Sequence, residues 1–183
     1  MKTFISMLRG INVSGHKRIS MAELKRLYES LGFVNVRTYV QSGNVVFDSA
    51  KSDQSKLTAL IEAQIKRSWG YAVSVFIRDP HDFQRLLGSN PFLKGRNEDP
   101  AKLHVTFLQH SPLKSALSSL EAPQAGPDEF VVKNQEIFLF CPEGYGRTKL
   151  SNNFFERKLD MPATTRNWNT IRALNQLAKE ERL

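Results

Sequence analysis

The sequence has little cysteine and no long hydrophobic run, and these absences exclude several classes of protein. It contains a single cysteine, Cys141, so it cannot form an internal disulfide, and we expect a reducing compartment, the cytoplasm. No apolar stretch approaches the roughly 18 residues that a transmembrane helix needs. The short apolar stretch at the N-terminus is interrupted by Arg9 and lacks a small-residue cleavage site. We therefore predict neither a signal peptide nor an association with a membrane.

Complete catalytic and cofactor-binding motifs are also absent. The sequence has no H-E-x-x-H, no C-x-x-C and no clustered carboxylates, which argues against a transition-metal site. It has no G-x-S-x-G, no G-x-x-x-x-G-K-[ST] phosphate loop and no G-x-G-x-x-G dinucleotide loop. Cys141 ends an expected strand, which favours a buried thiol over a nucleophile. The sequence thus identifies no reaction and no cofactor, and whether the protein is an enzyme stays open.

What the sequence does contain is an ordinary globular composition with an excess of positive charge. The 183 residues are 40% hydrophobic and 24% charged, enough to bury a sizeable core. The formal net charge is +8, and residues 1–40 carry seven basic against two acidic residues, a local net charge of +5. This excess favours a nucleotide, another phosphorylated small molecule or a nucleic acid as partner. A soluble protein with many lysines explains it equally well.

The first 78 residues are predicted to form one α+β unit. Strands are expected at 3–8, 36–40, 45–47 and 73–77, and helices at 21–31 and 53–69. Ser20 and Glu23 form a capping box at the start of the first helix. Gly32 is suited to end that helix in the left-handed conformation. The order β-α-β-β-α-β is that of a ferredoxin-like unit.

The second half resembles this plan imperfectly: β-α-β-β-α occurs again from 103 to 160, without detectable sequence repetition. Strands are expected at 103–108, 130–132 and 137–140, and helices at 111–120 and 151–159. Thr164 or Thr165 is expected to cap a last helix. We therefore predict an α+β fold of two tandem ferredoxin-like units with an added C-terminal helix. The polar loop at 89–101 marks the boundary between residues 1–88 and residues 89–183.

Strand order predicts a first candidate site. In a β-α-β-β-α-β unit the first two strands run in the same direction, so residues 9–18 should lie beside residues 41–44. The first helix begins at the same end and directs its positive dipole there. The candidate ligand-binding residues are Arg9, Asn12, Gly15, Lys17, Gln41, Ser42 and Asn44, with Ser14 and Arg18 in the same loop. Glycines, cations and a helix start suit an anion, but the glycines and asparagines also suit ordinary turns, and both interpretations stay open.

Two further candidates lie near the C-terminus, at residues 144–151 and 164–168. The residues selected from them are Gly146, Arg147, Lys149, Arg166, Asn167 and Trp168. The guanidinium of Arg166 is suited to bidentate pairing with an oxyanion. Trp168 is suited to stack on a base, although a tryptophan on an amphipathic helix is more often part of the core.

These stretches together resemble a known family. Similar residues occur at 7–15, 21, 24, 31–33, 38–47, 144–150, 153–154, 156 and 164–170. They resemble a mainly bacterial, uncharacterised family numbered 1697 among the domains of unknown function, which usually has Gly-Gly in place of Ser14-Gly15 and Ser in place of Thr148. The resemblance covers nearly the whole chain and implies an α+β architecture with duplicated units. It implies no reaction, cofactor or catalytic residue. Because its characteristic stretches coincide with the three candidate loops, we expect these loops to form one site.

Three functions fit these observations. A nucleotide- or nucleic-acid-binding module fits the charge and the element order, although residues 44–47 lack the paired aromatics of RNA-recognition domains. An enzyme or sensor for a small phosphorylated or carboxylate ligand requires the N-terminal and C-terminal loops to converge. A protein-interaction scaffold would use the motifs to maintain the interface between the units. We favour an anion-binding function, with a nucleotide or nucleic acid as the ligand.

Overall fold

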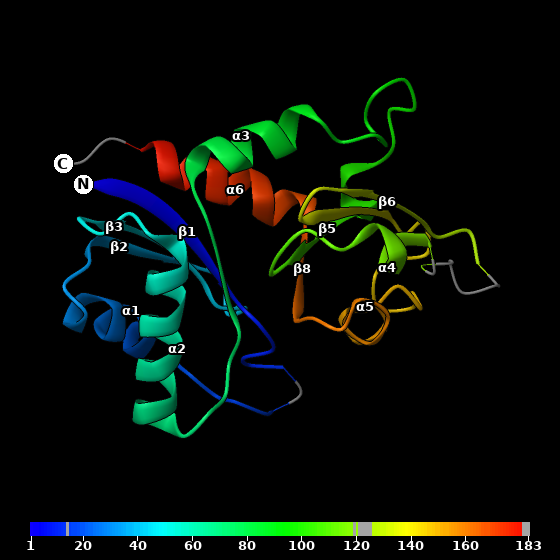
Figure 1. The fold of residues 1–183 in the computed structure, drawn as a ribbon. Helices are drawn as coiled ribbons and strands as arrows, with labels where there is room; N and C mark the ends of the chain where they lie inside the picture. The colour runs from blue at the N-terminus through cyan, green and yellow to red at the C-terminus, as the bar shows by residue number, and fades with distance from the viewer. Residues whose placement is uncertain (14, 119, 121–125, 181–183) are drawn as a thin grey trace. The chain divides into compact units, whose positions relative to one another are not determined.

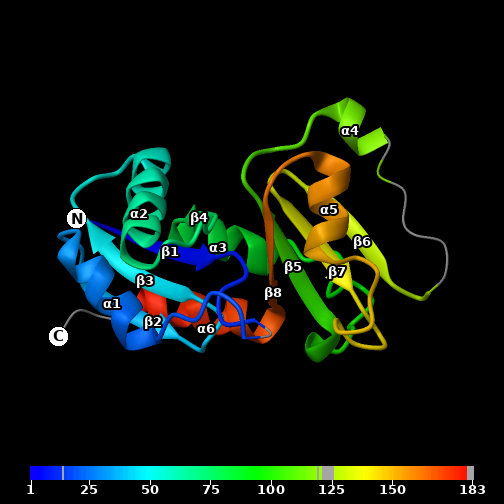
Figure 2. The same ribbon diagram turned by 90° about the horizontal axis from the view of Figure 1, so that it is seen from below.

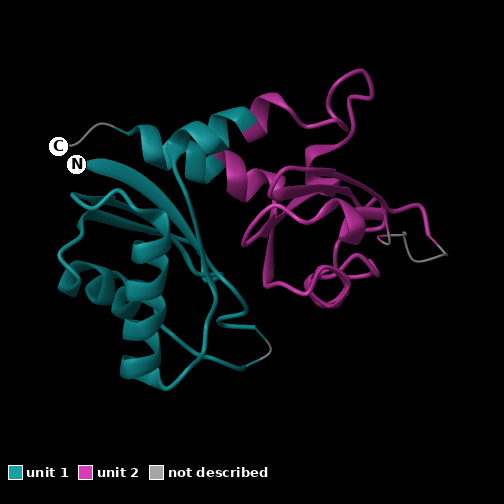
Figure 3. Cartoon of the chain, viewed as in Figure 1, with its two compact units in different colours: residues 1–85, 173–183 teal, residues 86–172 magenta. Residues whose placement is uncertain are grey.

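The chain divides into two compact units. The computed structural model describes residues 1–13, 15–118, 120 and 126–180. Unit 1 comprises Met1–Arg85 and the chain from Ala173 onward, and unit 2 comprises Leu86–Arg172 (Figure 3). The end of the last helix therefore groups with unit 1, not with the residues that precede it in the sequence, and Arg37 donates a hydrogen bond of 2.6 Å to the carbonyl of Leu177 there. The division into residues 1–88 and 89–183, as two units of one compact body, stays a prediction.

Unit 1 is a four-stranded antiparallel sheet with two helices on one face (Figure 1). Its elements are β1 (Lys2–Leu8), α1 (Met21–Ser30), β2 (Val34–Tyr39), β3 (Asn44–Ser49), α2 (Gln54–Trp69) and β4 (Val75–Arg78), followed by α3 (Pro80–Gly88). The strand order is β2-β3-β1-β4. Both β1 and β2 pair antiparallel with β3, so they run in the same direction, as the sequence predicts.

Helix α1 begins and ends where the sequence signals are. The side chain of Ser20 accepts a hydrogen bond from the amide of Glu23, and the Glu23 carboxylate accepts one from the amide of Ser20. At the other end Gly32 has a φ of +81°, and its amide donates to the carbonyl of Glu29 at 3.0 Å. Both caps satisfy backbone groups that a helix end leaves unpaired.

An aromatic cluster forms the centre of the unit 1 core, between the sheet and its two helices. The rings of Phe4, Tyr28, Phe33 and Phe47 lie with centroids 4.5 to 5.9 Å apart. The Tyr28 hydroxyl is buried and lies 2.5 Å from the hydroxyl of Ser6, and burial raises the pKa of Tyr28. The polar end of this ring is thus satisfied inside the core.

Unit 2 contains a second four-stranded antiparallel sheet, visible from below in Figure 2. Its elements are the 3-10 turn η1 (Pro100–Lys102), β5 (Leu103–Leu108), α4 (Lys114–Ser118), β6 (Glu129–Lys133), β7 (Glu136–Phe140), α5 (Asn152–Leu159) and β8 (Ala163–Asn167). The strand order is β6-β7-β5-β8, and α6 (Trp168–Lys179) follows β8. The described residues therefore form a mixed α+β fold with two four-stranded sheets and six helices.

Strand β8 corrects the sequence analysis. Thr164 and Thr165 do not cap a helix but pair with β5, where Thr165 lies opposite Thr106. Helix α6 starts at Trp168, and the Asn167 side-chain oxygen accepts a 2.7 Å hydrogen bond from the amide of Thr170. Threonine suits both a helix cap and a strand. The two threonines form a strand here because the edge of β5 provides hydrogen-bonding partners for it.

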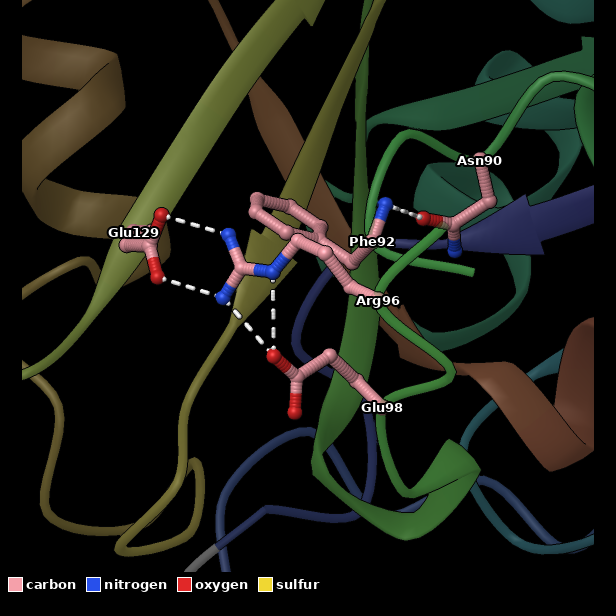
Figure 4. Close-up of polar contacts among 5 residues, drawn as sticks. All are labelled: Asn90, Phe92, Arg96, Glu98 and Glu129. Atoms are coloured by element: carbon pink, nitrogen blue, oxygen red, sulfur yellow. Dashed lines mark hydrogen bonds and ion pairs between the residues drawn. The ribbon is translucent and has the colours of Figure 1, made fainter. Parts of the chain in front are cut away.

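The polar loop after α3 is held to unit 2 by Arg96 (Figure 4). Its guanidinium bonds both carboxylate oxygens of Glu129 at 2.8 Å and reaches Glu98 at 2.8 and 3.0 Å. It also lies over the rings of Phe92 and Phe140, 5.2 and 5.3 Å from their centroids. Glu129 and then Glu98 raise the pKa of Arg96. Two carboxylates thus pair with this exposed cation and fix the polar loop beside β6 and β7.

Candidate functional site

The structure brings the two N-terminal loops together. The side-chain amide of Asn12 donates to the carbonyl of Gln41 and to the carbonyl of Ile19, each at 2.8 Å. Its oxygen accepts a bond from the amide of Ile19 at 2.9 Å. Asn12 therefore ties the loop after β1 to the β2–β3 turn and to the start of α1. This confirms the predicted meeting of residues 9–18 with residues 41–44.

Gly43 allows the close approach of these loops. Its φ is +76°, and a Cβ there would lie 2.7 Å from the Cδ1 of Ile11 and 2.9 Å from the Cβ of Leu8. Its carbonyl accepts the amide of Leu8 at 2.9 Å. Val40, in the same turn, has a φ of +50°, which a β-branched residue rarely adopts. Both observations indicate that the β2–β3 turn adopts this conformation because it packs closely on the loop after β1.

An open hollow of about 410 Å³ lies between the loops, and we call it the unit 1 hollow. It is lined by Asn12, Gly15, Arg18, Ile19, Ser20 and Gln41. Arg18 is exposed and makes no hydrogen bond or ion pair with the residues that the structure describes. A Cβ at Gly15 would lie 3.5 Å from the Arg18 Nη2, so the guanidinium lies beside the bare backbone of Gly15. The volume falls within the range of small-molecule sites, roughly 300–1,000 Å³.

Several predicted site residues of unit 1 serve the fold. The Lys17 ammonium donates to the carbonyl of Ala72 at 2.6 Å. Asn44 is fully buried, and its amide donates to the carbonyl of Tyr39 and to the hydroxyl of Ser42. Arg9 is half-buried. Of the residues that line the hollow, Arg18, Ser20 and Gln41 are exposed and carry polar side chains, while Ser14 lies outside the described residues.

In unit 2 the two C-terminal motifs each have polar or aromatic contacts with neighbouring elements, β5 and the start of α5. The Thr165 hydroxyl donates to the side-chain oxygen of Asn152 at 2.6 Å and lies 2.7 Å from the hydroxyl of Thr106. Tyr145 stacks on His104, with ring centroids 4.8 Å apart. The sequence did not select these residues as a group, because their meeting depends on the pairing of β5 with the unpredicted β8.

Burial disfavours the charged forms of two titratable groups of unit 2, His104 and Cys141. Burial lowers the pKa of His104, against a smaller opposing effect of the Lys102 backbone. Its Nδ1 has no hydrogen-bond partner among the described residues. Cys141 is fully buried, and burial raises the pKa of its thiol to about 11. A buried neutral thiol is a poor nucleophile, so the arrangement does not favour thiolate chemistry.

The selected C-terminal residues divide into buried and exposed groups. Arg166 is 7% exposed and donates to the Thr164 hydroxyl and the Thr165 carbonyl at 2.8 and 2.9 Å. Trp168 is 3% exposed, so its ring belongs to the core. The exposed members are Gly146, Arg147, Lys149 and Asn167. A single site shared by the N-terminal and C-terminal groups stays a prediction.

Within residues 1–13, 15–118, 120 and 126–180, no group of three or more His, Cys, Asp or Glu side chains is arranged to hold a metal ion. Across the same ranges, no helix has the length and apolar character needed to cross a membrane.

Sequence comparison identifies the family. Residues 1–138 match the family described as "Protein of unknown function (DUF1697)". The chain belongs to the DUF1697 family. The match confirms the resemblance and includes both loops of the unit 1 hollow, but it ends before residues 144–151. No curated protein matches the chain significantly.

A solved structure resembles the DUF1697 chain over its whole length. It is described as the conserved bacterial protein SP0830 from Streptococcus pneumoniae, with 26% sequence identity and a TM-score of 0.73. The similarity covers 97% of this chain and 99% of the other. The common fold therefore includes both units.

Proposed function

We propose that the unit 1 hollow binds a phosphorylated small molecule, with a nucleotide as the favoured ligand. The observation that carries this proposal is the exposed guanidinium of Arg18 at the hollow, beside the backbone of Gly15. A phosphate pairs with a guanidinium through short, charge-assisted hydrogen bonds. Gln41 adds a polar side chain at the rim. The net charge of +8 attracts anions over a longer range.

Burial of the sheet favours a nucleotide over a nucleic acid. RNA-recognition domains stack bases on an exposed sheet face. In unit 1 the side chains of Ile5, Met7 and Val46 are 0% exposed, so the face that they share offers no platform. By contrast, Val13 and Val40, next to Asn12 and Gln41 in the sequence, are 56% and 50% exposed. They offer an apolar surface for the base or sugar of one nucleotide.

A ligand panel tests the class of ligand by isothermal titration calorimetry. Adenosine 5′-monophosphate is expected to bind, and adenosine, which lacks the phosphate, is expected not to. A single-stranded RNA oligonucleotide would bind through many phosphates, and its affinity would fall steeply between 50 and 200 mM salt. Equal binding of adenosine and its monophosphate would contradict a phosphate site. Binding of the oligonucleotide alone would favour a nucleic-acid module.

A second candidate function is favoured by the burial of Arg166. If the motif residues maintain the fold of a protein-interaction scaffold, Arg166→Ala lowers the melting temperature and leaves ligand affinity unchanged. The hydrogen bonds of Arg166 to Thr164 and Thr165 support this reading for the C-terminal motif. An unchanged melting temperature would oppose it.

We infer two tandem ferredoxin-like units, because the orders β2-β3-β1-β4 and β6-β7-β5-β8 follow one pattern with the same element sequence. The single, buried Cys141 fits a reducing compartment, and we propose the cytoplasm.

A further inference from the structure

The carboxylate of Glu23 is bound to Ser20, one of the residues that line the unit 1 hollow. Ser20 lines the hollow, and both of its donors are directed to one oxygen of Glu23. The Ser20 hydroxyl donates to the Glu23 Oε2 at 2.6 Å, and the Ser20 amide donates to the same atom at 3.3 Å. The Ser20 hydroxyl and amide, which could otherwise donate to a ligand phosphate, are thus already bound to the Glu23 carboxylate.

The carboxylate of Glu23 opposes a bound phosphate in two ways. It occupies the donors of Ser20, so a ligand gains them only by displacing it. It also places a negative charge next to Ser20, which lines the hollow together with the positively charged Arg18. Like charges a few ångströms apart repel even in water, by roughly a fivefold factor in affinity for each unit of ligand charge.

We propose that Glu23 is an internal competitor that sets the anion affinity of the hollow. This inference rests on the proposed function of the hollow. It assigns opposite roles to two side chains near one site: Arg18 attracts the phosphate, and Glu23 restrains it. A ligand binds well only if its phosphate bonds Arg18 strongly enough to offset the repulsion by Glu23.

The substitution Glu23→Gln isolates the charge. Glutamine also serves in a capping box, so its oxygen keeps the hydrogen bond to the Ser20 amide and preserves the helix start. The matched control is Glu29→Gln, which removes the same charge from the last turn of α1, where Glu29 pairs with Lys25 at 3.8 Å. Affinity for adenosine 5′-monophosphate is measured by calorimetry at low salt for the wild type and both variants, with circular dichroism to verify folding.

The expected result is an affinity roughly five- to 25-fold higher in E23Q than in the wild type, for a phosphate that carries one to two negative charges, with little change in E29Q. Adding Arg18→Gln to E23Q should abolish the gain. Equal affinities in E23Q and the wild type would overturn the inference, and so would equal gains in E23Q and E29Q, which would indicate a general effect of net charge. If Arg18→Gln weakens wild-type binding while E23Q changes nothing, only this inference fails. If no variant binds the nucleotide, the proposed function fails with it.

Discussion

At the scale of single residues, the loops of the unit 1 hollow combine side chains that build the site with side chains left to meet a ligand. The sequence predicts both kinds, because glycine, asparagine and cations serve turns and anion sites alike. Only the structure separates them. Asn12 uses its amide within the loops, whereas Gln41 contributes its backbone carbonyl to that contact and keeps its side chain exposed.

Paired alanine substitutions test this separation. Asn12→Ala removes three hydrogen bonds and should lower the free energy of unfolding by about 1–3 kcal/mol. Gln41→Ala leaves the backbone carbonyl in place and should change stability by less than about 0.5 kcal/mol. Urea denaturation measures both. Similar losses of stability in the two variants would contradict the assigned roles.

The two turn glycines of these loops make a second matched pair. Gly10 and Gly43 both have positive φ, at +66° and +76°, but only Gly43 has atoms within 3 Å of an added Cβ. Gly10→Ala should lower the free energy of unfolding by about 1–2 kcal/mol, from backbone strain alone. Gly43→Ala adds a clash with Leu8 and Ile11 and should lower it by about 2–4 kcal/mol. Equal losses in the two variants would mean that the turn moves away from Leu8 without cost.

At the scale of elements, the ends of α1 and α2 were predicted accurately because each has a strong capping signal in the local sequence. The capping box at Ser20 and the glycine at position 32 predicted both ends of α1, and Gly70, with a φ of +74°, ends α2. Strand β8 could not be predicted in this way. Its sequence contains two threonines beside a helix, and its conformation depends on a partner, β5, about 60 residues earlier in the chain. The cluster of Thr106, Asn152 and Thr165 depends on that pairing and was missed for the same reason.

The contact between β5 and the loop before α5 predicts a pH dependence. Burial lowers the pKa of His104 below its ordinary value of 6.5, so the unfolded chain binds a proton more readily than the folded one. Stability should therefore be complete above pH 6.5 and fall as the pH decreases below it. Denaturation midpoints at pH 7.5 and 5.5 measure this. The pKa of Glu129 is lowered from its ordinary 4.5. This residue therefore affects stability only below about pH 4.5 and does not contribute to the difference between pH 7.5 and 5.5.

The control for His104 is a ring that does not titrate. His104→Phe retains an aromatic partner for Tyr145 and should reduce the difference in stability between pH 7.5 and 5.5. The other histidines, His16, His81 and His110, are exposed and stay in both proteins. An unchanged difference in the variant would show that His104 is not the titrating group.

At the scale of the whole molecule, the sequence predicted the α+β class and the family, and charge pointed to an anion. The sequence could not select among 26 basic residues, because selection depends on which cations the fold already neutralises. Arg96 is paired with two carboxylates and Lys17 with a carbonyl. Arg18 is left exposed at the hollow, and the account of function depends on this residue.

The measurement that tests this account most directly compares two variants of equal charge. Arg18→Gln removes the cation at the hollow. The control, Lys56→Gln, removes a cation that does not line the hollow. Lys56 lies in the first turn of α2, and the helix rises by about 21 Å from there to Gly70 at its other end. Calorimetric titration with adenosine 5′-monophosphate should give an affinity lower by about 10- to 100-fold in Arg18→Gln, the loss of one charge-assisted contact, and an unchanged affinity in Lys56→Gln. Equal affinities in both variants and the wild type would contradict a phosphate site at the unit 1 hollow.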